Sequence, residues 1–331
     1  MQSNDAPRSP RAAPRNSSPS PRILLLGAGH AHLYALKHGG DYDRHGAAAT
    51  AVSPEEFWYS GLATGMLGGQ YEPDADRVDA GALGAARGIR VIRGEAQHID
   101  VERRCVTLLG GTVLDYDLLS LNVGSTVAPL PGSADHPAVF PVKPVRMLWE
   151  LRRFLSARLA APSGAAPGGT LRVVVAGGGA TGCEIAANVD ALARRHGRRI
   201  AVTIVTAGSR LLEQLPAGAA REVERLLRRR GIAILCGREV ERIERREALL
   251  ADGAALEFDA LVNATGLEPP PLIAASGLAA DRHGALLVDA RLRCVGDELI
   301  FGAGDCIAID GHPLPRVGVY AVRQAPVLHA N

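Results

Sequence analysis

The chain has 331 residues, enough for two or three domains of ordinary size, and a formal net charge of +2 at pH 7. Aromatic residues make up 4% of it and the basic residues are scattered, so the sequence lacks the signature of a nucleic-acid-binding protein. Its five cysteines form no CxxC pair, and no apolar run approaches the ~20 residues that span a bilayer. These features argue against a disulfide scaffold, a zinc ribbon and an integral membrane protein, and they favour the cytoplasm.

The first elements predict a βαβ unit behind a disordered tail. Residues 1–21 are rich in Pro, Ser, Ala and Arg and almost free of apolar residues, so we expect a disordered basic tail. A strand is predicted from Ile23, a helix over 33–38 after a glycine turn, and a second strand over 47–52. Residues 54–70, rich in aromatic residues and glycine, are predicted as a long loop or a broken helix.

The middle of the chain predicts a strand over 89–92 and an antiparallel stretch over 95–121, with a turn at Gly110-Gly111. Four leucines at helical spacing predict a helix over 144–160. Residues 161–170 follow, rich in Pro, Gly, Ser and Ala, and we interpret them as a linker between domains.

A second unit begins at Leu171 and repeats the order of the first. A strand is predicted over 200–205, a helix over 222–230, a strand over 232–235 and an antiparallel stretch over 240–258. Residues 269–331 contain no glycine turn of their own. We therefore expect them to complete the first domain, into which the second unit is inserted.

One nucleotide-binding layout occurs twice. Residues 23–32 read ILLLGAGHAH and residues 173–182 read VVVAGGGATG, each an apolar run, a glycine turn and a helical start of small residues. A pyrophosphate binds the backbone N–H groups at such a helix N-terminus, and glycines permit the tight turn and close approach. The units also end alike, at Asn122-Val123-Gly124 and Ala264-Thr265-Gly266. Two sites in one chain indicate two cofactors that exchange electrons.

The first motif is incomplete. Gly27 and Gly29 are present, but His32 occupies the third glycine position, and Ser53 stands near where an acidic residue would bind ribose. His30 and His32 either contact the phosphate or the flavin edge, or pack at a crowded turn. We expect no metal at this pair, because no further ligands converge on it in the sequence.

The second motif is complete, with Gly177, Gly179 and Gly182. No acidic residue ends the next strand, which runs to Thr206, and Arg210 follows nearby. This pattern, with Arg210 as the nearby cation, leans toward tolerance of the 2′-phosphate of NADPH. The alternative is that Arg210 is a solvated surface charge.

These residues carry a family resemblance. The two glycine motifs, Asn263-Ala264-Thr265-Gly266 and Phe301-Gly302-Ala303-Gly304-Asp305-Cys306 resemble FAD-dependent pyridine nucleotide-disulfide oxidoreductases. Within that superfamily the chain resembles the type II NADH dehydrogenase branch, and it is most similar to the flavoprotein module fused to some selenide, water dikinases. The narrower resemblance covers residues 22–331 and is carried by residues 27–32, 59–61, 122–125, 141–144 and 318–324.

The resemblance implies an α/β fold with two Rossmann-like three-layer (β-β-α) dinucleotide-binding domains. The FAD domain is discontinuous, over 22–160 and 269–331, and the NAD(P)H domain covers 171–268. The implied activity is an FAD-dependent NAD(P)H dehydrogenase, in which a hydride passes to FAD and electrons pass on to a small-molecule acceptor. A quinone, a soluble carrier and a selenium or sulfur species all stay open as acceptors. A nucleotide-binding redox sensor with little turnover is the rival from another class.

The resemblance and the motifs together predict the site residues. In the FAD unit the expected binding residues are Gly27, Gly29, His30, Ala31, His32, Ser53, Tyr59, Ser60, Gly61, Ala96, Asn122, Val123, Gly124, Gly304, Asp305, Tyr320 and Ala321. In the NAD(P)H unit they are Gly177, Gly179, Ala180, Thr181, Gly182, Thr206, Arg210, Thr265 and Gly266.

The family pattern also gives some of these residues roles. Asp305 would bind the ribityl chain of FAD, and residues 320–324 would open a helix aimed at the flavin pyrimidine ring. Lys143 stands where the family places a basic residue near the isoalloxazine, and we expect it to pair with Glu184. These two are the candidate catalytic residues. The alternatives are a surface lysine between two prolines and a helix-start glutamate favoured by the helix dipole.

Two differences from the family pattern restrict the functions that this chain can have. Residues 57–71 hold no cysteine pair, which excludes the flavin–disulfide relay of glutathione and thioredoxin reductases. We expect Cys105, Cys183 and Cys294 to be buried structural thiols, and Cys306 to pack. Type II dehydrogenases continue past the flavin-capping helix into a membrane-docking region, whereas this chain ends at Asn331. We therefore expect at most a peripheral contact with the inner face of the membrane.

Overall fold

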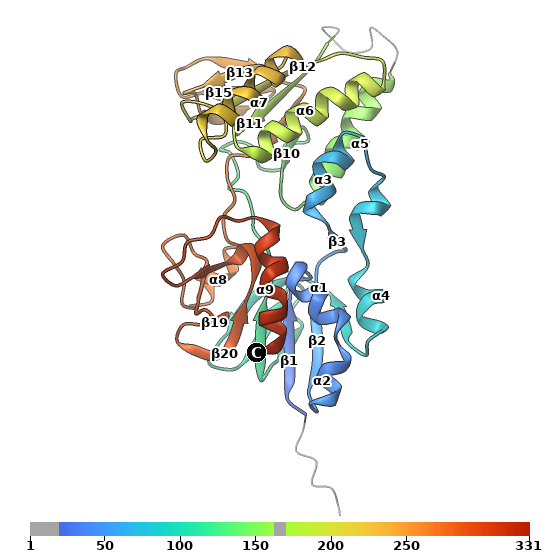
Figure 1. Ribbon diagram of the computed structural model, residues 1–331, viewed down its shortest axis with the longest axis vertical. Coiled ribbons are helices and arrows are strands. Elements are labelled where there is room, and N and C mark those ends of the chain that lie inside the picture. Colours follow the sequence, from blue (N-terminus) through green and yellow to red (C-terminus); the bar gives the residue numbers. More distant parts are fainter. Residues whose placement is uncertain (1–19, 162–169) are drawn as a thin grey trace, which may run out of the picture.

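The computed structural model describes residues 20–161 and 170–331, and it forms two lobes joined by a narrower waist (Figure 1). Nearly all of the expected tail over 1–21 and the expected linker over 161–170 lies outside the described residues. The upper lobe consists mainly of the elements between Leu171 and Asn263, and both ends of the described chain belong to the lower lobe (Figure 1). Within the described residues, no helix is both long and apolar enough to cross a membrane.

The lower lobe is built on an eight-stranded sheet with the order β21-β18-β19-β20-β9-β1-β2-β5. β1 pairs in parallel with β2 and β9, and β9 pairs in parallel with β20. Four of the eight strands come from the chain after residue 285, so the last segment completes the first sheet as expected. The strands are β1 Arg22–Leu26, β2 Ala48–Ser53, β5 Arg90–Arg93, β9 Leu118–Leu121, β18 Leu286–Val288, β19 Arg293–Cys294, β20 Asp297–Gly302 and β21 Ile307–Ile309.

Alternating side chains of β1 give this lobe its three layers. Leu24 and Leu26 join the core beneath a small antiparallel sheet, whereas Leu25 joins the core beneath the helices. Side chains on a strand alternate between the two faces, so one apolar run serves both cores. The antiparallel strands are β6 Ala96–Asp100, β7 Cys105–Leu108 and β8 Val113–Asp115, and the helices of the other layer are α1 His30–Lys37, α2 Gly40–Arg44, α4 Ala80–Ala85 and α9 Gly318–Ala330. Helix α8, Leu272–Ala275, packs beside β6 in the core of Leu24 and Leu26.

The upper lobe repeats this plan on a parallel five-stranded sheet with the order β10-β17-β11-β12-β13. A second antiparallel sheet packs beside it, as the repeated sequence layout predicts. The elements are β10 Val139–Pro141, β11 Leu171–Ala176, β12 Ile200–Thr206, β13 Ala233–Cys236, β14 Val240–Glu244, β15 Glu247–Leu250, β16 Ala255–Glu257, β17 Ala260–Asn263, α5 Arg146–Ala160, α6 Ala180–Arg195 and α7 Ala217–Arg229.

Two segments differ from the sequence predictions. β10 pairs with β17, so the chain enters the upper sheet well before residue 160, where we expected the first part of the FAD domain to end. β9 lies parallel to β1 inside the large sheet and is not part of the antiparallel stretch. Residues 54–70, predicted as a long loop or a broken helix, contain helix α3, Ser60–Leu67, whose residues Met66 and Leu67 are fully buried. Burial of these two side chains stabilises a glycine-containing helix of low intrinsic propensity.

The remaining elements of the lower lobe are short. β3 Phe57–Trp58 pairs with β4 Arg77–Val78, and the 3-10 helices η1 Pro73–Asp76 and η2 Gly304–Cys306 lie in the connections. Four of the five cysteines, Cys105, Cys183, Cys294 and Cys306, are buried as expected, and all five are free thiols. Burial raises the pKa of Cys183 and of Cys306 to about 11, so both stay protonated and unreactive at neutral pH.

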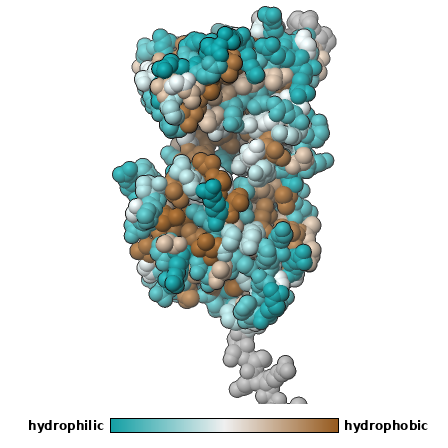
Figure 2. Space-filling model, viewed as in Figure 1, coloured by the Kyte–Doolittle hydropathy of each residue, from teal (hydrophilic) through white to brown (hydrophobic). Residues whose placement is uncertain are grey.

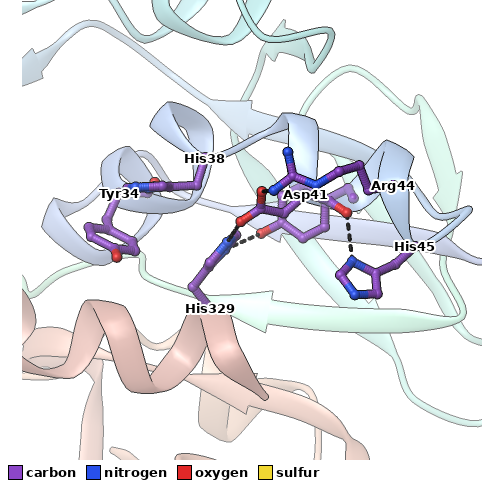
Figure 3. A network of polar contacts seen from close by, with 7 residues as sticks. Tyr34, His38, Asp41, Arg44, His45 and His329 are labelled. Carbon is purple, nitrogen blue, oxygen red and sulfur yellow. Dashed lines mark hydrogen bonds and ion pairs between the residues drawn. The ribbon is translucent and has the colours of Figure 1, made fainter.

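A polar contact fastens the end of α9 to α2 (Figure 3). The ring of His329 donates from Nε2 to the Oδ2 atom of Asp41 over 2.9 Å, and Arg44 also pairs with this carboxylate. Tyr34 lies edge-on to the same histidine ring at 5.8 Å between centroids. Helix α9 ends the segment over 269–331 that completes the lower sheet. This contact therefore holds that segment against α1 and α2.

We expect Asp41→Asn to lower Tm by a few degrees at pH 7, since the amide cannot replace the charge-assisted bond. The hydrogen bond from His329 lowers the pKa of Asp41 against the opposing effect of burial. A carboxyl with a lowered folded pKa stabilises above its unfolded pKa, and that stability is lost as pH falls through the folded pKa. Thermal unfolding across pH should therefore show the two proteins converging in acid, with exposed Asp43→Asn as the control. Equal Tm values at pH 7 would contradict this role.

Candidate functional site

The first glycine turn joins β1 to α1 under the end of β9. Gly27 has φ +85°, and a Cβ there would lie 2.4 Å from the carbonyl oxygen of Asn122. A Cβ at Gly29 would lie 2.4 Å from the side-chain oxygen of the same residue. Both predicted glycines are therefore required by the protein itself, because Asn122 approaches the turn so closely.

Asn122 also caps helix α1. Its Oδ1 accepts hydrogen bonds from the backbone N–H groups of Ala31 and His32 at 3.0 and 3.2 Å, and its Nδ2 donates to the carbonyl of Ala303 over 2.6 Å. The side chain is 3% exposed. Two of the N–H groups that we expected to meet a pyrophosphate thus have a protein partner. The sequence pattern placed Asn122 in the site but did not predict that it caps α1. The available signal was its position in the ending that the two units share.

His32 is a packing residue of this turn. It is fully buried, and its ring nitrogens lie 2.6 Å from the carbonyl oxygen of Gly27 and 2.8 Å from the hydroxyl of Ser120. A carbonyl only accepts, so Nδ1 carries the proton and Nε2 accepts from the serine. Burial lowers the pKa of His32 to about 4, which keeps the ring neutral. Of the two alternatives left open for His32, the geometry favours packing.

His30 has different surroundings. Its ring lies edge-on to Phe57 and Tyr59, with centroids 4.8 and 5.4 Å apart, and a Cβ on Gly318 would lie 3.3 Å from its Cε1. Burial, and next the charge of Lys143, lower the pKa of His30. The first turns of α1 and α9 therefore meet at this neutral ring.

Lys143 and Asp305 form the charged centre of the lower site. Their Nζ and Oδ2 atoms are 3.9 Å apart, and Ser125 donates from its hydroxyl to the same Oδ2 over 2.9 Å. Both charged side chains are largely buried, at 21% and 13% exposed. A carboxylate held by a hydroxyl and an ammonium suits the polyol chain that we expected at Asp305.

The expected pair between Lys143 and Glu184 is absent. Glu184 instead accepts a hydrogen bond of 3.0 Å from the hydroxyl of Thr64 on α3. The lysine lies in the segment after β10. It contacts Asp305, which belongs to the segment over 269–331 of the lower lobe. Sequence reasoning missed this partner because it depends on how the two lobes pack.

Helix α9 begins beside Asp305. The Oε1 atom of Gln324 accepts from the N–H of Gly304 over 2.7 Å, and Tyr320 and Ala321 lie in the first turn of the helix. Arg316 donates to the carbonyls of Asp305 and Leu267 at 3.0 and 3.4 Å. A cavity of about 530 Å³ opens here and is lined by Gly304, Asp305, Arg316, Tyr320 and Gln324 among others. Arg316 is a site residue that no motif indicated.

The other predicted residues of this unit lie on several different elements. Ser53 is 8% exposed at the end of β2, and its hydroxyl donates to the carbonyl of Glu55 over 2.9 Å. Ser60 and Gly61 form the first turn of α3 after Tyr59. Gly124 has φ +72° with open space before it, next to Val123, and Ala96 begins β6.

In the second glycine turn, some glycines are packed against backbone atoms and others face open space. A Cβ on Gly177 would lie 2.1 Å from the carbonyl oxygen of Ala264, and one on Gly182 would lie 2.0 Å from that of Gly177. A Cβ on Gly179 or Gly266 would meet no atom within 4 Å. The first pair is required for helix and strand to approach, whereas Gly179 faces empty space at the N-terminus of α6. That space is where a pyrophosphate would bind.

A cavity of about 410 Å³ lies at this turn. It is lined by the predicted residues Gly177, Gly179, Ala180, Thr181, Gly182, Thr206, Thr265 and Gly266, and also by Val142, Arg238, Glu239 and Leu267. Its volume is in the range of ordinary ligand sites. Arg210 does not line it, because its guanidinium donates to four backbone carbonyls, of Leu211, Leu212, Glu213 and Leu215, at 2.9 to 3.2 Å.

Short links join the two sites across the waist. Val142 lines the upper cavity, and the next residue, Lys143, contacts Asp305 in the lower site. Leu267 lines the upper cavity, and its carbonyl accepts from Arg316 of the lower site. Thr126 and Glu268 exchange backbone hydrogen bonds of 2.8 and 2.9 Å between the same segments. These contacts tie the two sites together across the waist.

Comparisons with known proteins agree with this arrangement. The family described as pyridine nucleotide-disulphide oxidoreductase matches residues 21–325. The chain is 26% identical to a nitric oxide reductase FlRd-NAD(+) reductase of Pectobacterium atrosepticum, over 88% of this chain and 74% of the relative. It is 30% identical to an NADH dehydrogenase-like protein of Mycobacterium tuberculosis, over 72% of this chain and 60% of the relative.

A solved structure shares the fold. It holds putidaredoxin reductase in a covalent complex with putidaredoxin, and it superposes with a TM-score of 0.77 at 23% identity over 95% of this chain and 75% of that chain. The chain thus spans three fifths to three quarters of the lengths of these three proteins.

The contrast between the glycines of α6 gives a direct test of the upper site. We expect Gly179→Ala to keep the wild-type Tm but to weaken dinucleotide binding at least about tenfold, since its Cβ occupies only the empty cavity. Gly182→Ala should instead cost about 2 kcal/mol of folding free energy, because its Cβ overlaps a backbone carbonyl. Thermal unfolding and fluorescence titration with NADH and NADPH separate the two effects. Unchanged affinity in Gly179→Ala would rule out pyrophosphate binding there.

Proposed function

Because the chain belongs to the pyridine nucleotide-disulphide oxidoreductase family, we propose that it transfers electrons from NAD(P)H through FAD to a small redox-carrier protein. Family membership itself provides the oxidoreductase chemistry and the cofactors FAD and NAD(P)H. The proposal adds the electron acceptor and the residues that serve each cofactor.

One observation carries the proposal: consecutive residues serve the two sites. Val142 lines the cavity at the second glycine turn, and Lys143 contacts Asp305 at the first. A hydride moves only between reacting atoms that are almost in contact. A nucleotide held at Gly179 and a flavin held at Asp305 would approach one another along this segment.

In this proposal FAD, when bound, supplies the hydride-accepting ring system. The residues of the chain position and polarise it. Asp305 and Ser125 would bind the ribityl hydroxyls, and the N-terminus of α9 would place positive helix-dipole charge at the pyrimidine edge. Lys143, beside Asp305, would add a full positive charge near the bound flavin. Glu184, held by Thr64, would border the nicotinamide at the start of α6.

The tolerance of a 2′-phosphate that the sequence favoured depended on Arg210. The two terminal guanidinium nitrogens of Arg210 donate to backbone carbonyls of its own loop. The cation that lines the nucleotide cavity is Arg238, which pairs with Asp252 at 3.1 Å and is followed by Glu239. A cation and a carboxylate side by side suit the ribose of either nucleotide, and we propose that the chain accepts both.

The choice of a carrier protein has two supports. The relative from Pectobacterium is named as a reductase of a redox protein. Leu314 and Val317, which line the cavity next to Asp305, are 44% and 50% exposed. Figure 2 shows apolar side chains gathered on the lower lobe just below the waist, where the surface is hollowed. Exposed apolar surface beside a redox centre is typical of a protein contact.

The acceptor is tested by steady-state oxidation of NADH and NADPH. We expect the FAD-loaded protein to reduce a rubredoxin or a [2Fe–2S] ferredoxin at least about tenfold faster than a water-soluble quinone at equal concentration. Quinone reduction is the rival outcome, which the NADH dehydrogenase-like relative suggests. Fast turnover with the quinone and none with either carrier would overturn the proposed acceptor.

Lys143 has a matched control, because the only other lysine in the chain is the exposed Lys37. We expect Lys143→Met to slow flavin reduction by NADH about tenfold to a hundredfold, since a positive charge next to the ring is lost. Lys37→Met should leave that rate unchanged. Anaerobic stopped-flow absorbance measures both rates, and equal rates in the two variants would remove Lys143 from the site.

A further inference from the structure

A third cavity, of about 300 Å³, lies between α1, the β3–β4 pair with η1, and α9, and His30 and Tyr59 in its wall are also expected FAD-binding residues. Aromatic rings form much of its wall, from His30, Tyr34, Phe57 and Tyr59. Most of the remaining wall is aliphatic, including Val322 on α9. An engineered apolar cavity of about 150 Å³ already holds benzene, so this space accommodates one substituted ring or a compact cation.

The exception to the apolar lining is Asp76. It is the last residue of η1, it has no exposed surface, and neither carboxylate oxygen has a hydrogen-bond partner among the described residues. The backbone of this residue is fixed, because its carbonyl accepts from the N–H of Tyr59 over 2.8 Å. A buried carboxylate without partners is unusual and calls for a ligand or a counter-ion.

The neighbouring cation does not serve Asp76. Arg77 pairs with Asp74 and, at 3.1 Å, with Glu56, and its guanidinium lies over the ring of Trp58 at 5.6 Å. Burial raises the pKa of Asp76 to about 6, so most of the population is ionised at pH 7. The protein therefore keeps an unpaired charge at the cavity, at a cost that a bound cation would offset.

We propose that this cavity binds a small organic cation, a substituted ammonium or amidinium, with the carboxylate of Asp76 as its counter-ion. The rings of Tyr34, Phe57 and Tyr59 line the cavity, so cation–π attraction would add to the ion pair. His30 belongs to this wall and also lies within the electrostatic reach of Lys143 and Asp305. A cation bound here would thus border the flavin site, and its binding does not require the proposed function.

The test compares two probes of nearly equal shape, benzylammonium and benzyl alcohol, by calorimetric titration of the full FAD-loaded chain at pH 7.5. We expect the cation to bind wild-type protein at least about tenfold more tightly than the alcohol. Asp76→Asn should reduce this ratio to about one. The control Asp74→Asn, an exposed carboxylate in the same 3-10 helix, should leave the ratio unchanged.

A second variant tests the same cavity without a substitution at Asp76, so the result does not depend on whether Asp76→Asn folds. Val322 is 51% exposed on α9, so Val322→Trp should fold normally while its indole fills the cavity and abolishes binding of both probes. Equal affinities of the two probes for the wild-type protein would overturn the proposal. So would a preference for the cation that survives Asp76→Asn or Val322→Trp.

Discussion

The buried amide of Asn122 is the contact on which the lower site depends. It binds the first turn of α1 through its oxygen and the end of β20 through its nitrogen, so it joins residues 31–32 to residue 303. These segments are far apart in sequence, and their meeting makes a discontinuous domain into one site. The glycine at 29 follows from this contact, because a side chain there would overlap the amide, and the glycine at 27 avoids the backbone carbonyl of the same residue. Asn263 has a parallel position in the upper lobe, where it binds the carbonyl of Ala128 and the hydroxyl of Thr265.

The waist brings the two glycine-turn sites close to one another. The segment after β10 and the segment after β17 both cross it, and each carries residues of both sites within a few positions. The carboxyl ends of the parallel strands in the two lobes therefore face one another, which is where open α/β sheets bind their ligands. In this arrangement the protein contributes proximity and fixed charge, and the chemistry belongs to the cofactors.

Local sequence patterns predicted those features of the fold that depend on contacts between neighbouring elements. The apolar runs at 23–26 and 173–176 and the glycines behind them predicted both turns, because those residues pack against their own strands and helices. The partners of Lys143 and of Arg210 were not predictable, since each depends on packing between distant segments or on a loop's own carbonyls. The burial of Asp76 had no sequence signal at all, because its neighbours Asp74 and Arg77 look like an ordinary solvated charge cluster.

The central claim is that a nucleotide in the upper lobe reduces a flavin in the lower lobe. The most direct measurement is the anaerobic absorbance spectrum of the purified protein, before and after adding NADH and then NADPH. The account predicts a bound flavin spectrum that bleaches on addition of nucleotide, and that bleaches more slowly in Lys143→Met. A colourless protein, or a flavin that stays oxidised with both nucleotides, would contradict it.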